Sequence, residues 1–366
     1  MFGLSPHVKH RVRRSAEPLA GGRERVIAAL LLMVACSTAV RAAQPPIVVM
    51  DLTARLEGPA TDPMSQPSDV VVTPSGTIWV LDGVHMRLAR FSADGRFERY
   101  VSLGPRPLDD HRLPVGMGLD KTGDLLVGDR DRGTILRLKS DGALGSTIMI
   151  PREAAEKPAD PTDVIPSPSG LTLLVVDNDN HCVKEIDPSG RLVRRLGRRG
   201  SGPGEMDYPA TIAVAAGGQL AVADVLNARV DIFDGGGKPL RSIGSLGVVA
   251  GKFYRPKGVA IDRAGRLHVT DSFTGVVQTF DLEGRLIGVW GAAPGQPYRL
   301  RSPATIVADG AGRFYIAEML ADCVTVWREG RKYILEGTPA ASPVLQNAGV
   351  EGIGGNDRRK VHERTL

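Results

Sequence analysis

Cysteine, aromatic residues and long apolar runs are all scarce in this chain of 366 residues. Three cysteines are a poor basis for a disulfide framework. The apolar run 26–35, "VIAALLLMVA", is too short for a membrane-spanning helix. Aromatic residues make up only 5%, whereas the chain has 44 glycines and 26 prolines. This balance favours many short strands joined by turns.

Net positive charge is concentrated at the chain ends. Residues 1–25 contain six Lys and Arg against two Glu, a net charge of +4. Residues 338–366 contain four against three acids, a net charge of +1. The whole chain has a formal charge of +5, so about zero remains for the part between. A neutral body excludes the electrostatic surface that a nucleic acid requires.

The amino-terminal region resembles an export signal, with basic residues before the short apolar run. The sequence is compatible with two alternative processing sites. "VRA" predicts ordinary cleavage after Ala42, whereas "MVAC" resembles a bacterial lipobox with Cys36 as the lipidated first residue. Both predict a protein outside the cytoplasm, in the periplasm or cell envelope. A lipid anchor would be its one attachment to a membrane.

A repeat of about 47 residues runs through most of the sequence. Each unit has a proline, then a turn glycine, an acid that closes the following strand and a large apolar residue. The prolines are Pro67, Pro114, Pro161, Pro209, Pro256 and Pro303. The acids are Asp82, Asp129, Asp177, Asp224, Asp271 and Glu318.

Each unit is predicted to form four short strands, a to d. In the fifth unit these are "GVAID", "RLHVTD", "VVQTF" and "RLIGVW". Short strands with glycine turns at this period are typical of propeller blades. We therefore expect an all-β, six-bladed β-propeller of four-stranded antiparallel blades over residues 43–337, preceded by the signal region 1–42. Residues 338–366 are expected to be disordered.

Closure of the ring requires one further strand, and two segments compete for this place. Residues 47–58, "IVVMDLTARLEG", resemble a strand d that precedes the first blade. Residues 331–337, "RKYILEG", are the alternative. Either would pair with strand c of the sixth blade and remove an open edge.

The glycine-rich stretch 194–209, "RRLGRRGSGPGEMDYP", raises the question of a phosphate-binding loop. Such a loop normally opens a helix, but a strand, a turn and a second strand follow here. The stretch is instead predicted to connect strand d of blade 3 with strand a of blade 4. Its neighbouring basic residues, Arg198 and Arg199 among them, are a solvated edge or a contact for an acidic partner.

The phrases "LGRRGSGPGEMDYPATIAVAAGGQLAVADVLNARVDIFD" and "DNDNHCVKEID" resemble the NHL repeat, and the resemblance covers all six units. It implies a six-bladed propeller and no particular reaction. In such a blade, the d-to-a connectors and b-to-c loops share one face. Their variability predicts that this face is the working surface.

Two positions after each proline we expect the mouth of the central channel. The residues there are Asp69, Gly116, Asp163, Thr211, Gly258 and Thr305. Small residues suit a crowded axis, but the two acids need another explanation. They would bind a cation or ligand amine, or accept hydrogen bonds from connector N–H groups, and we favour the second. Asp69, Asp163, Thr211, Thr305, Arg198 and Arg199 are the candidate ligand-binding residues.

Three histidines, His85, His111 and His181, are expected on the same face, whereas His268 is expected to pack within a strand. Peptidylglycine-amidating lyases have a related propeller with zinc held by histidines, which makes these three the candidate metal ligands. No HxH or HExxH spacing supports them.

Cys182 and Cys323 fall on opposite blades, too far apart for a disulfide, and are expected to be free, buried thiols.

These features favour a non-catalytic binding scaffold that recognises a protein, peptide or polymer on its loop-rich face. We expect it to be a monomer without a cofactor. The alternative is a metal-dependent lyase or lactonase that acts at the channel mouth, with a divalent metal near Asp69 and Asp163.

Overall fold

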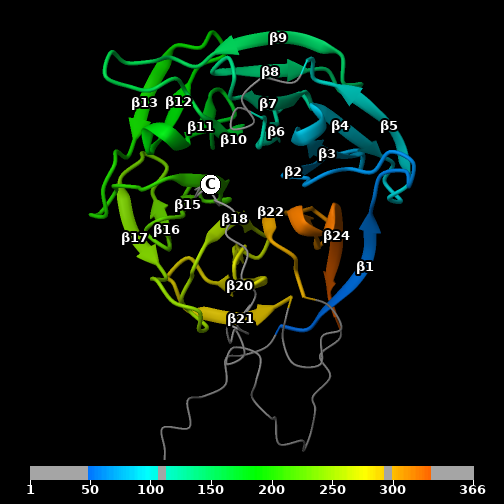
Figure 1. Cartoon of the computed structure of the whole chain (residues 1–366). Helices are drawn as coiled ribbons and strands as arrows, with labels where there is room; N and C mark the ends of the chain where they lie inside the picture. Colours follow the sequence, from blue (N-terminus) through cyan, green and yellow to red (C-terminus); the bar gives the residue numbers. More distant parts are fainter. Residues whose placement is uncertain (1–47, 106–112, 292–298, 331–366) are drawn as a thin grey trace, which may run out of the picture. The chain divides into compact units, whose positions relative to one another are not determined.

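A computed structural model of the chain describes residues 48–105, 113–291 and 299–330. These residues form six four-stranded antiparallel sheets arranged around an axis, as Figure 1 shows. The expected all-β propeller with six four-stranded blades is therefore confirmed. The predicted signal region 1–42 and tail 338–366 lie outside the described residues. Within the described part, no helix is long and apolar enough to span a membrane.

The strands follow the repeat closely. Blades 1 and 2 consist of β2 (Asp69–Val72), β3 (Ile78–Asp82), β4 (Arg87–Phe91), β5 (Phe97–Ser102), β6 (Met117–Leu119), β7 (Leu125–Asp129), β8 (Thr134–Leu138) and β9 (Leu144–Met149). Blades 3 and 4 consist of β10 (Pro161–Pro166), β11 (Leu173–Asp177), β12 (Cys182–Ile186), β13 (Leu192–Leu196), β14 (Pro209–Val214), β15 (Leu220–Asp224), β16 (Arg229–Phe233) and β17 (Pro239–Ile243).

Blades 5 and 6 complete the ring. They consist of β18 (Pro256–Ile261), β19 (Leu267–Asp271), β20 (Val276–Phe280), β21 (Leu286–Trp290), β22 (Pro303–Ala308), β23 (Arg313–Glu318), β24 (Cys323–Glu329) and β1 (Met50–Leu56). Single turns of 3-10 helix lie in three b-to-c loops: η1 (Gly83–His85), η3 (Asn178–Asn180) and η4 (Met319–Ala321).

The amino-terminal strand closes the ring. β1 pairs antiparallel with β24, from Met50 opposite Glu329 to Leu56 opposite Val324. Of the two candidates for this place, the segment 47–58 is thus confirmed. Its competitor 331–337 lies outside the described residues. The first strand of the described residues, β1, therefore serves as strand d of the last blade.

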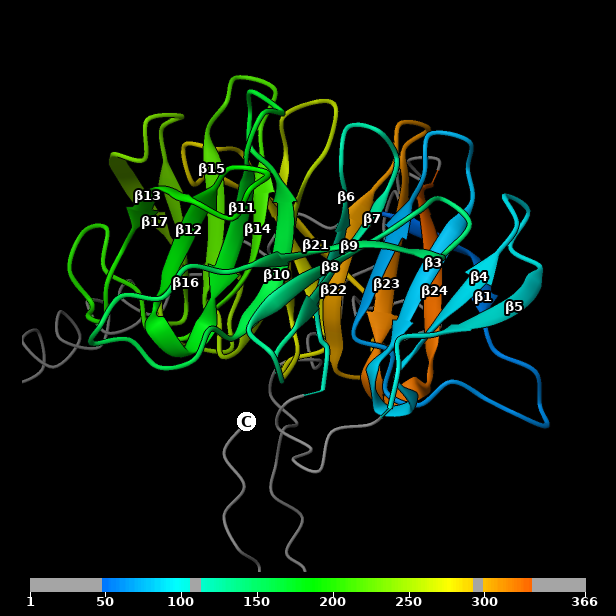
Figure 2. The ribbon, with the colours of Figure 1, turned by 90° about the horizontal axis from the view of Figure 1, so that it is seen from above.

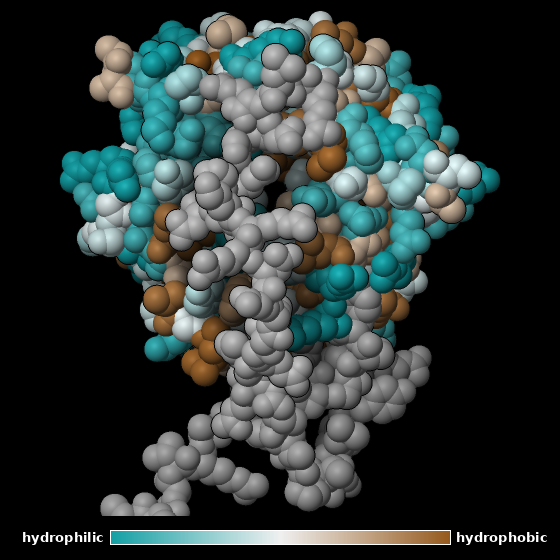
Figure 3. Space-filling model, viewed as in Figure 1, coloured by the Kyte–Doolittle hydropathy of each residue, from teal (hydrophilic) through white to brown (hydrophobic). Residues whose placement is uncertain are grey.

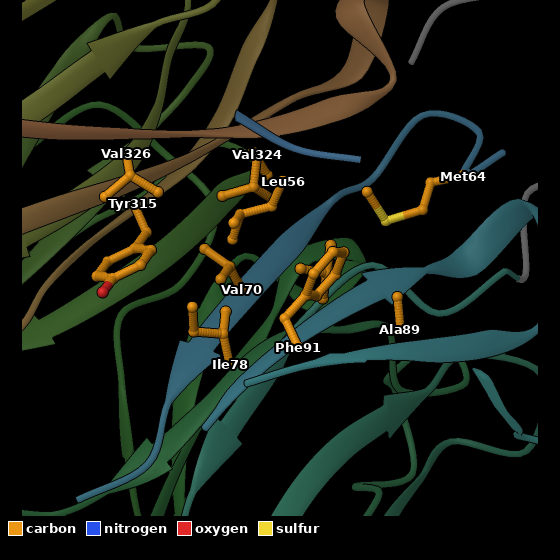
Figure 4. Close-up of a cluster of buried hydrophobic side chains, with 11 residues drawn as sticks. Leu56, Met64, Val70, Ile78, Ala89, Phe91, Tyr315, Val324 and Val326 are labelled. Carbon is orange, nitrogen blue, oxygen red and sulfur yellow. The ribbon is translucent and has the colours of Figure 1, made fainter. Parts of the chain in front are cut away.

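Apolar side chains fill the space between each blade and the next. Separate buried clusters lie between all six successive pairs of blades, including blades 6 and 1. Figure 4 shows the last of these, where Leu56 and Tyr315 from blade 6 meet Val70 and Phe91 from blade 1. Strand b is buried along its whole length in the first five blades, because both its faces are covered. Each blade thus covers an apolar face of its neighbour.

The two faces of the ring differ in their connections. Short turns join strands a to b and c to d on one face, along the upper edge of Figure 2. The other face carries the d-to-a connectors and the b-to-c loops with their 3-10 turns, along the lower edge of Figure 2. We call this second surface the loop-rich face. It is the face seen in Figure 1.

Candidate functional site

The acid that ends strand b organises the loop-rich face. Its carboxylate accepts a hydrogen bond from the backbone N–H of a residue 17 positions earlier, in the connector that enters the same blade. The acceptor and donor pairs are Asp82 with Ser65, Asp177 with Asp160, Asp224 with Asp207, Asp271 with Tyr254 and Glu318 with Arg301. Bonds from backbone N–H groups of the following loop occur in blades 2 and 5, to Asp129 and Asp271. The acid therefore holds mainly the incoming connector.

At the channel mouth, the two acids connect neighbouring blades. Asp69 accepts hydrogen bonds from its own neighbour, Val70 N–H at 2.8 Å, and from Met117 N–H of blade 2 at 2.7 Å. Asp163 accepts one from Ile212 N–H of blade 4 at 2.9 Å. The donors lie in the next strand a, whereas the sequence placed them in the connectors. The acids thus bridge blades along the inner wall.

The other residues of the channel mouth continue this pattern. Thr211 donates its hydroxyl to the carbonyl of Lys257 in blade 5 at 2.6 Å and accepts from Val259 N–H at 3.1 Å. Thr305 hydrogen-bonds with Asp69. At Gly116 the next strand is so close that a Cβ atom would lie 2.0 Å from the carbonyl oxygen of Thr162. Neighbouring strands a approach so closely at the axis that the position must be glycine where no side chain bridges the two blades.

Burial changes the acid–base properties of Asp69 and Asp163. Burial raises the pKa of Asp69 to about 7, against the lowering effect of its hydrogen bonds. Burial, and then repulsion from Asp69, raises the pKa of Asp163 well above its ordinary value. Two carboxyl groups whose charges repel resist ionising together. Near neutral pH this pair therefore retains a proton.

This arrangement predicts that acid stabilises the fold. A carboxyl group whose folded-state pKa is raised stabilises the protein fully below its unfolded pKa of about 3.8, and this contribution is lost as the pH rises through about 7. We expect the free energy of unfolding to fall between pH 4 and 7, by at most about 1.4 kcal/mol per unit of pKa shift. Asp69→Asn should reduce this slope, because one of the carboxyl groups with a raised pKa is gone, whereas Asp163 and Asp224 still titrate.

Urea unfolding from pH 4 to 8 measures this slope. Glu283→Gln, which removes a carboxylate from an exposed turn, is the matched control and should keep the wild-type slope. An equal slope in wild type and Asp69→Asn would contradict the assignment of the proton to this pair.

The candidate metal ligands lie apart. His85 Nδ1 lies 2.9 Å from Asp82, whereas His181 Nδ1 accepts a hydrogen bond from Tyr208 N–H at 3.1 Å. Burial lowers the pKa of His181. His111 lies outside the described residues. Among the residues described, no three His, Cys, Asp or Glu side chains cluster as a metal site would require.

The candidate arginines lie on the exposed connector between blades 3 and 4. The side chains of Arg198 and Arg199 are 78% and 74% exposed. Arg198 pairs with Glu205 at 3.0 Å, and Arg199 lies 3.8 Å from Asp207. Exposed pairs of this kind contribute little to stability. Both guanidinium groups therefore remain accessible to a partner.

Predictions of purely structural roles are confirmed at three positions. Cys182 and Cys323 are buried free thiols, and burial raises the pKa of each to about 12. His268 is buried, with Nε2 3.1 Å from Asp262 and Nδ1 3.0 Å from the Thr279 hydroxyl. None of these groups faces the channel mouth as a nucleophile or base. Cys36, the predicted lipidation site, lies outside the described residues.

The sequence did not reveal an apolar patch on the loop-rich face. Its exposed side chains come from the connectors and b-to-c loops of blades 4 to 6: Leu226, Leu246, Val248, Val249, Tyr254, Phe273 and Leu320. The rings of Tyr254 and Phe273 stack with centroids 4.1 Å apart, although they are 47% and 53% exposed. Figure 3 shows brown side chains over blades 4 and 5, at the lower left.

Lys257 was also missed. It directly follows the repeat proline, where the other blades have Ser68, Val115, Thr162, Ala210 and Ala304. Burial lowers the pKa of Lys257 to about 8, and the positive charges of Arg255 and Arg130 act in the same direction. A search for the one charged member of this set of positions would have found it.

Comparison with known proteins identifies the fold alone. No family model matches the chain, and no curated protein matches it. A solved structure of inactive virginiamycin B lyase from Staphylococcus aureus with quinupristin has a TM-score of 0.55 and 14% identity, covering 76% of this chain and 85% of that one. A streptogramin B lyase has a TM-score of 0.55 and 12% identity, covering 77% and 98%. Hydrazine synthase from Kuenenia stuttgartiensis has a TM-score of 0.50 and 13% identity, covering 72% and 95%.

Proposed function

We propose that this chain is an exported, NHL-type propeller that acts as a non-catalytic scaffold and binds a protein or peptide on its loop-rich face. The observation that carries the proposal is the apolar patch. Of the large apolar side chains exposed in the described residues, most lie in the connectors and b-to-c loops of three consecutive blades. Exposed apolar side chains that gather on one face of a domain are typical of a binding site.

We further propose a cellular location and an oligomeric state for the protein. The basic and apolar amino-terminal segment supports export to the periplasm or envelope, with either cleavage after Ala42 or a lipid anchor on Cys36. The neutral body of the chain supports a partner other than nucleic acid. We propose a monomer, since the ring closes on itself through β1. We also propose that it needs no cofactor.

Crosslinking in the native envelope, followed by mass spectrometry, tests the scaffold function. The double variant Tyr254→Ala/Phe273→Ala removes the stacked pair and should lose at least about nine tenths of the crosslinked partner, as expected for aromatic anchors. Leu144→Ala/Met149→Ala, on the outer strand β9, is the control and should retain it. Equal recovery with both double variants would overturn the proposal.

A metal-dependent lyase or lactonase is the second candidate. The coupled carboxyl groups of Asp69 and Asp163 at the channel mouth favour it, as do the lyases among the solved propellers. Elemental analysis separates the two functions. One zinc or calcium ion per chain, lost in Asp163→Asn, would support the enzyme. Protein without bound metal, with wild-type partner binding, would support the scaffold.

A further inference from the structure

The inner end of blade 5 differs electrostatically from the equivalent ends of blades 1 to 4. In those blades a cation pairs with the acid that ends strand b: Arg87 with Asp82, Arg132 with Asp129, Lys184 with Asp177 and Arg229 with Asp224. In blade 5 the acid is Asp271, and Val276 stands at the position of Arg87 and Arg229.

The carboxylate of Asp271 is instead fully used by the backbone. It accepts hydrogen bonds from the N–H groups of Tyr254, Arg255, Phe273 and Thr274, at 2.7 to 3.2 Å. Two oxygens with four such bonds have no free lone pair for a cation. Asp271 therefore shapes this loop without forming an ion pair.

Arg255 and Lys257, beside this loop, form no ion pair with any acid among the described residues. The positive charge of Arg130, in blade 2, also acts on Lys257, and Arg130 itself pairs with Asp160. Three cations against two carboxylates, Asp160 and Asp271, leave a net positive charge between these residues. We call Arg130, Arg255 and Lys257 the cationic rim.

The aromatic stack adjoins the cationic rim. Tyr254 directly precedes Arg255, and Phe273 is fixed next to it because both chain segments bind Asp271. Ser272 strengthens the same junction, since its N–H donates to the Arg255 carbonyl at 3.0 Å. An apolar shelf and a net positive charge are thus neighbours in the chain around Asp271.

We propose that the inner end of blade 5 binds an acidic peptide segment, with a side-chain carboxylate on Lys257 and Arg255 and a neighbouring aromatic side chain against Tyr254 and Phe273. This inference rests on the proposed scaffold function and defines the chemistry of its partner. Charge complementarity favours a carboxylate, which gains a charge-assisted hydrogen bond to a lysine that has no acidic partner among the described residues. The shelf favours an aromatic neighbour, because stacked rings add to the area buried.

Isothermal titration with two short peptides tests the proposal. The probes are acetyl-Phe-Glu-amide and its neutral counterpart acetyl-Phe-Gln-amide, added to the full chain. We expect the acidic peptide to bind at least about tenfold more tightly, the effect of one charge-assisted hydrogen bond. Lys257→Met should abolish this preference, whereas Lys257→Arg should keep most of it. Lys121→Met, which removes an exposed lysine from a turn of the opposite face, should leave it unchanged.

Several results of this titration would overturn the proposal. Equal affinity for the two peptides, or an unaltered preference in Lys257→Met, overturns the proposal while leaving the apolar scaffold function intact. Absence of binding by the acidic peptide at millimolar concentration also overturns it. Inorganic phosphate that binds through Lys257 as tightly as the peptide would point to a small anion and contradict the peptide. Thermal melts of Lys257→Arg show that the fold itself is retained.

Discussion

A chain that begins at Pro59 should fail to form a stable monomer, in contrast to one that begins at Val48. The shorter chain lacks β1, which is the outer strand of blade 6. Met50 and Leu56 of this strand are buried in the clusters on the two sides of that blade. Loss of a buried Leu or Met side chain costs about 2–5 kcal/mol, and a domain has only about 5–15 kcal/mol in total. β24 would also become an unpaired edge, which promotes aggregation.

Size-exclusion chromatography and thermal melts of the two chains measure this effect. A synthetic peptide of residues 48–58 should restore the monomer when added to the shorter chain. The same peptide with Leu56→Asp should not, because the carboxylate would enter the cluster between blades 6 and 1. A monomer that begins at Pro59 and melts within a few degrees of the longer chain would show that another segment closes the ring.

Much of this fold follows from the periodicity. In the fifth unit, the predicted strands at 258–262, 266–271, 276–280 and 285–290 agree within two residues with β18, β19, β20 and β21. Local patterns suffice here because each strand alternates with a glycine turn and packs with its own repeat neighbours. The ring then follows, since no blade can cover both of its apolar faces alone.

The contacts of the site could be predicted only in part. Asp69 reaches Met117, 48 residues further on, and Asp163 reaches Ile212, 49 residues on. A carboxylate at the channel mouth was visible in the sequence, but its partner depends on how closely two blades approach. The spacing of 17 between each strand-b acid and its connector donor was present in the sequence, although no residue type marks the backbone donor.

Lys257 and the stacked pair were missed for a different reason. Positions that recur in all six units specify the scaffold. Lys257 and the pair of Tyr254 and Phe273 each occur in one blade only. A repeat pattern consists of residues that the units share, so it does not contain them. The fold brings Tyr254 and Phe273 together and shows that backbone N–H groups, not an ion pair, bind the Asp271 carboxylate.

Lys184→Met should cost about 3–5 kcal/mol of unfolding free energy, the second large effect that the structure predicts. Lys184 has no exposed surface. Its Nζ lies 2.7 Å from Glu156, 2.9 Å from Asp177 and 2.8 Å from the Pro151 carbonyl. Burial alone would lower the pKa of Lys184, but the two carboxylates outweigh this and raise it. Removal of the ammonium group leaves both acids buried without their shared cation.

Urea unfolding of four variants tests this assignment: Lys184→Met, Lys157→Met, Glu156→Gln and the double variant Glu156→Gln/Lys184→Met. Lys157→Met removes a lysine from an exposed pair with Asp179 and should change the free energy of unfolding by no more than about 1 kcal/mol. In a Glu156→Gln background, Lys184→Met should cost less than in the wild type, because one of the two stranded charges is already absent. Equal costs in both backgrounds would mean that Lys184 is not coupled to Glu156, and would contradict a shared ion network of the two acids and the lysine.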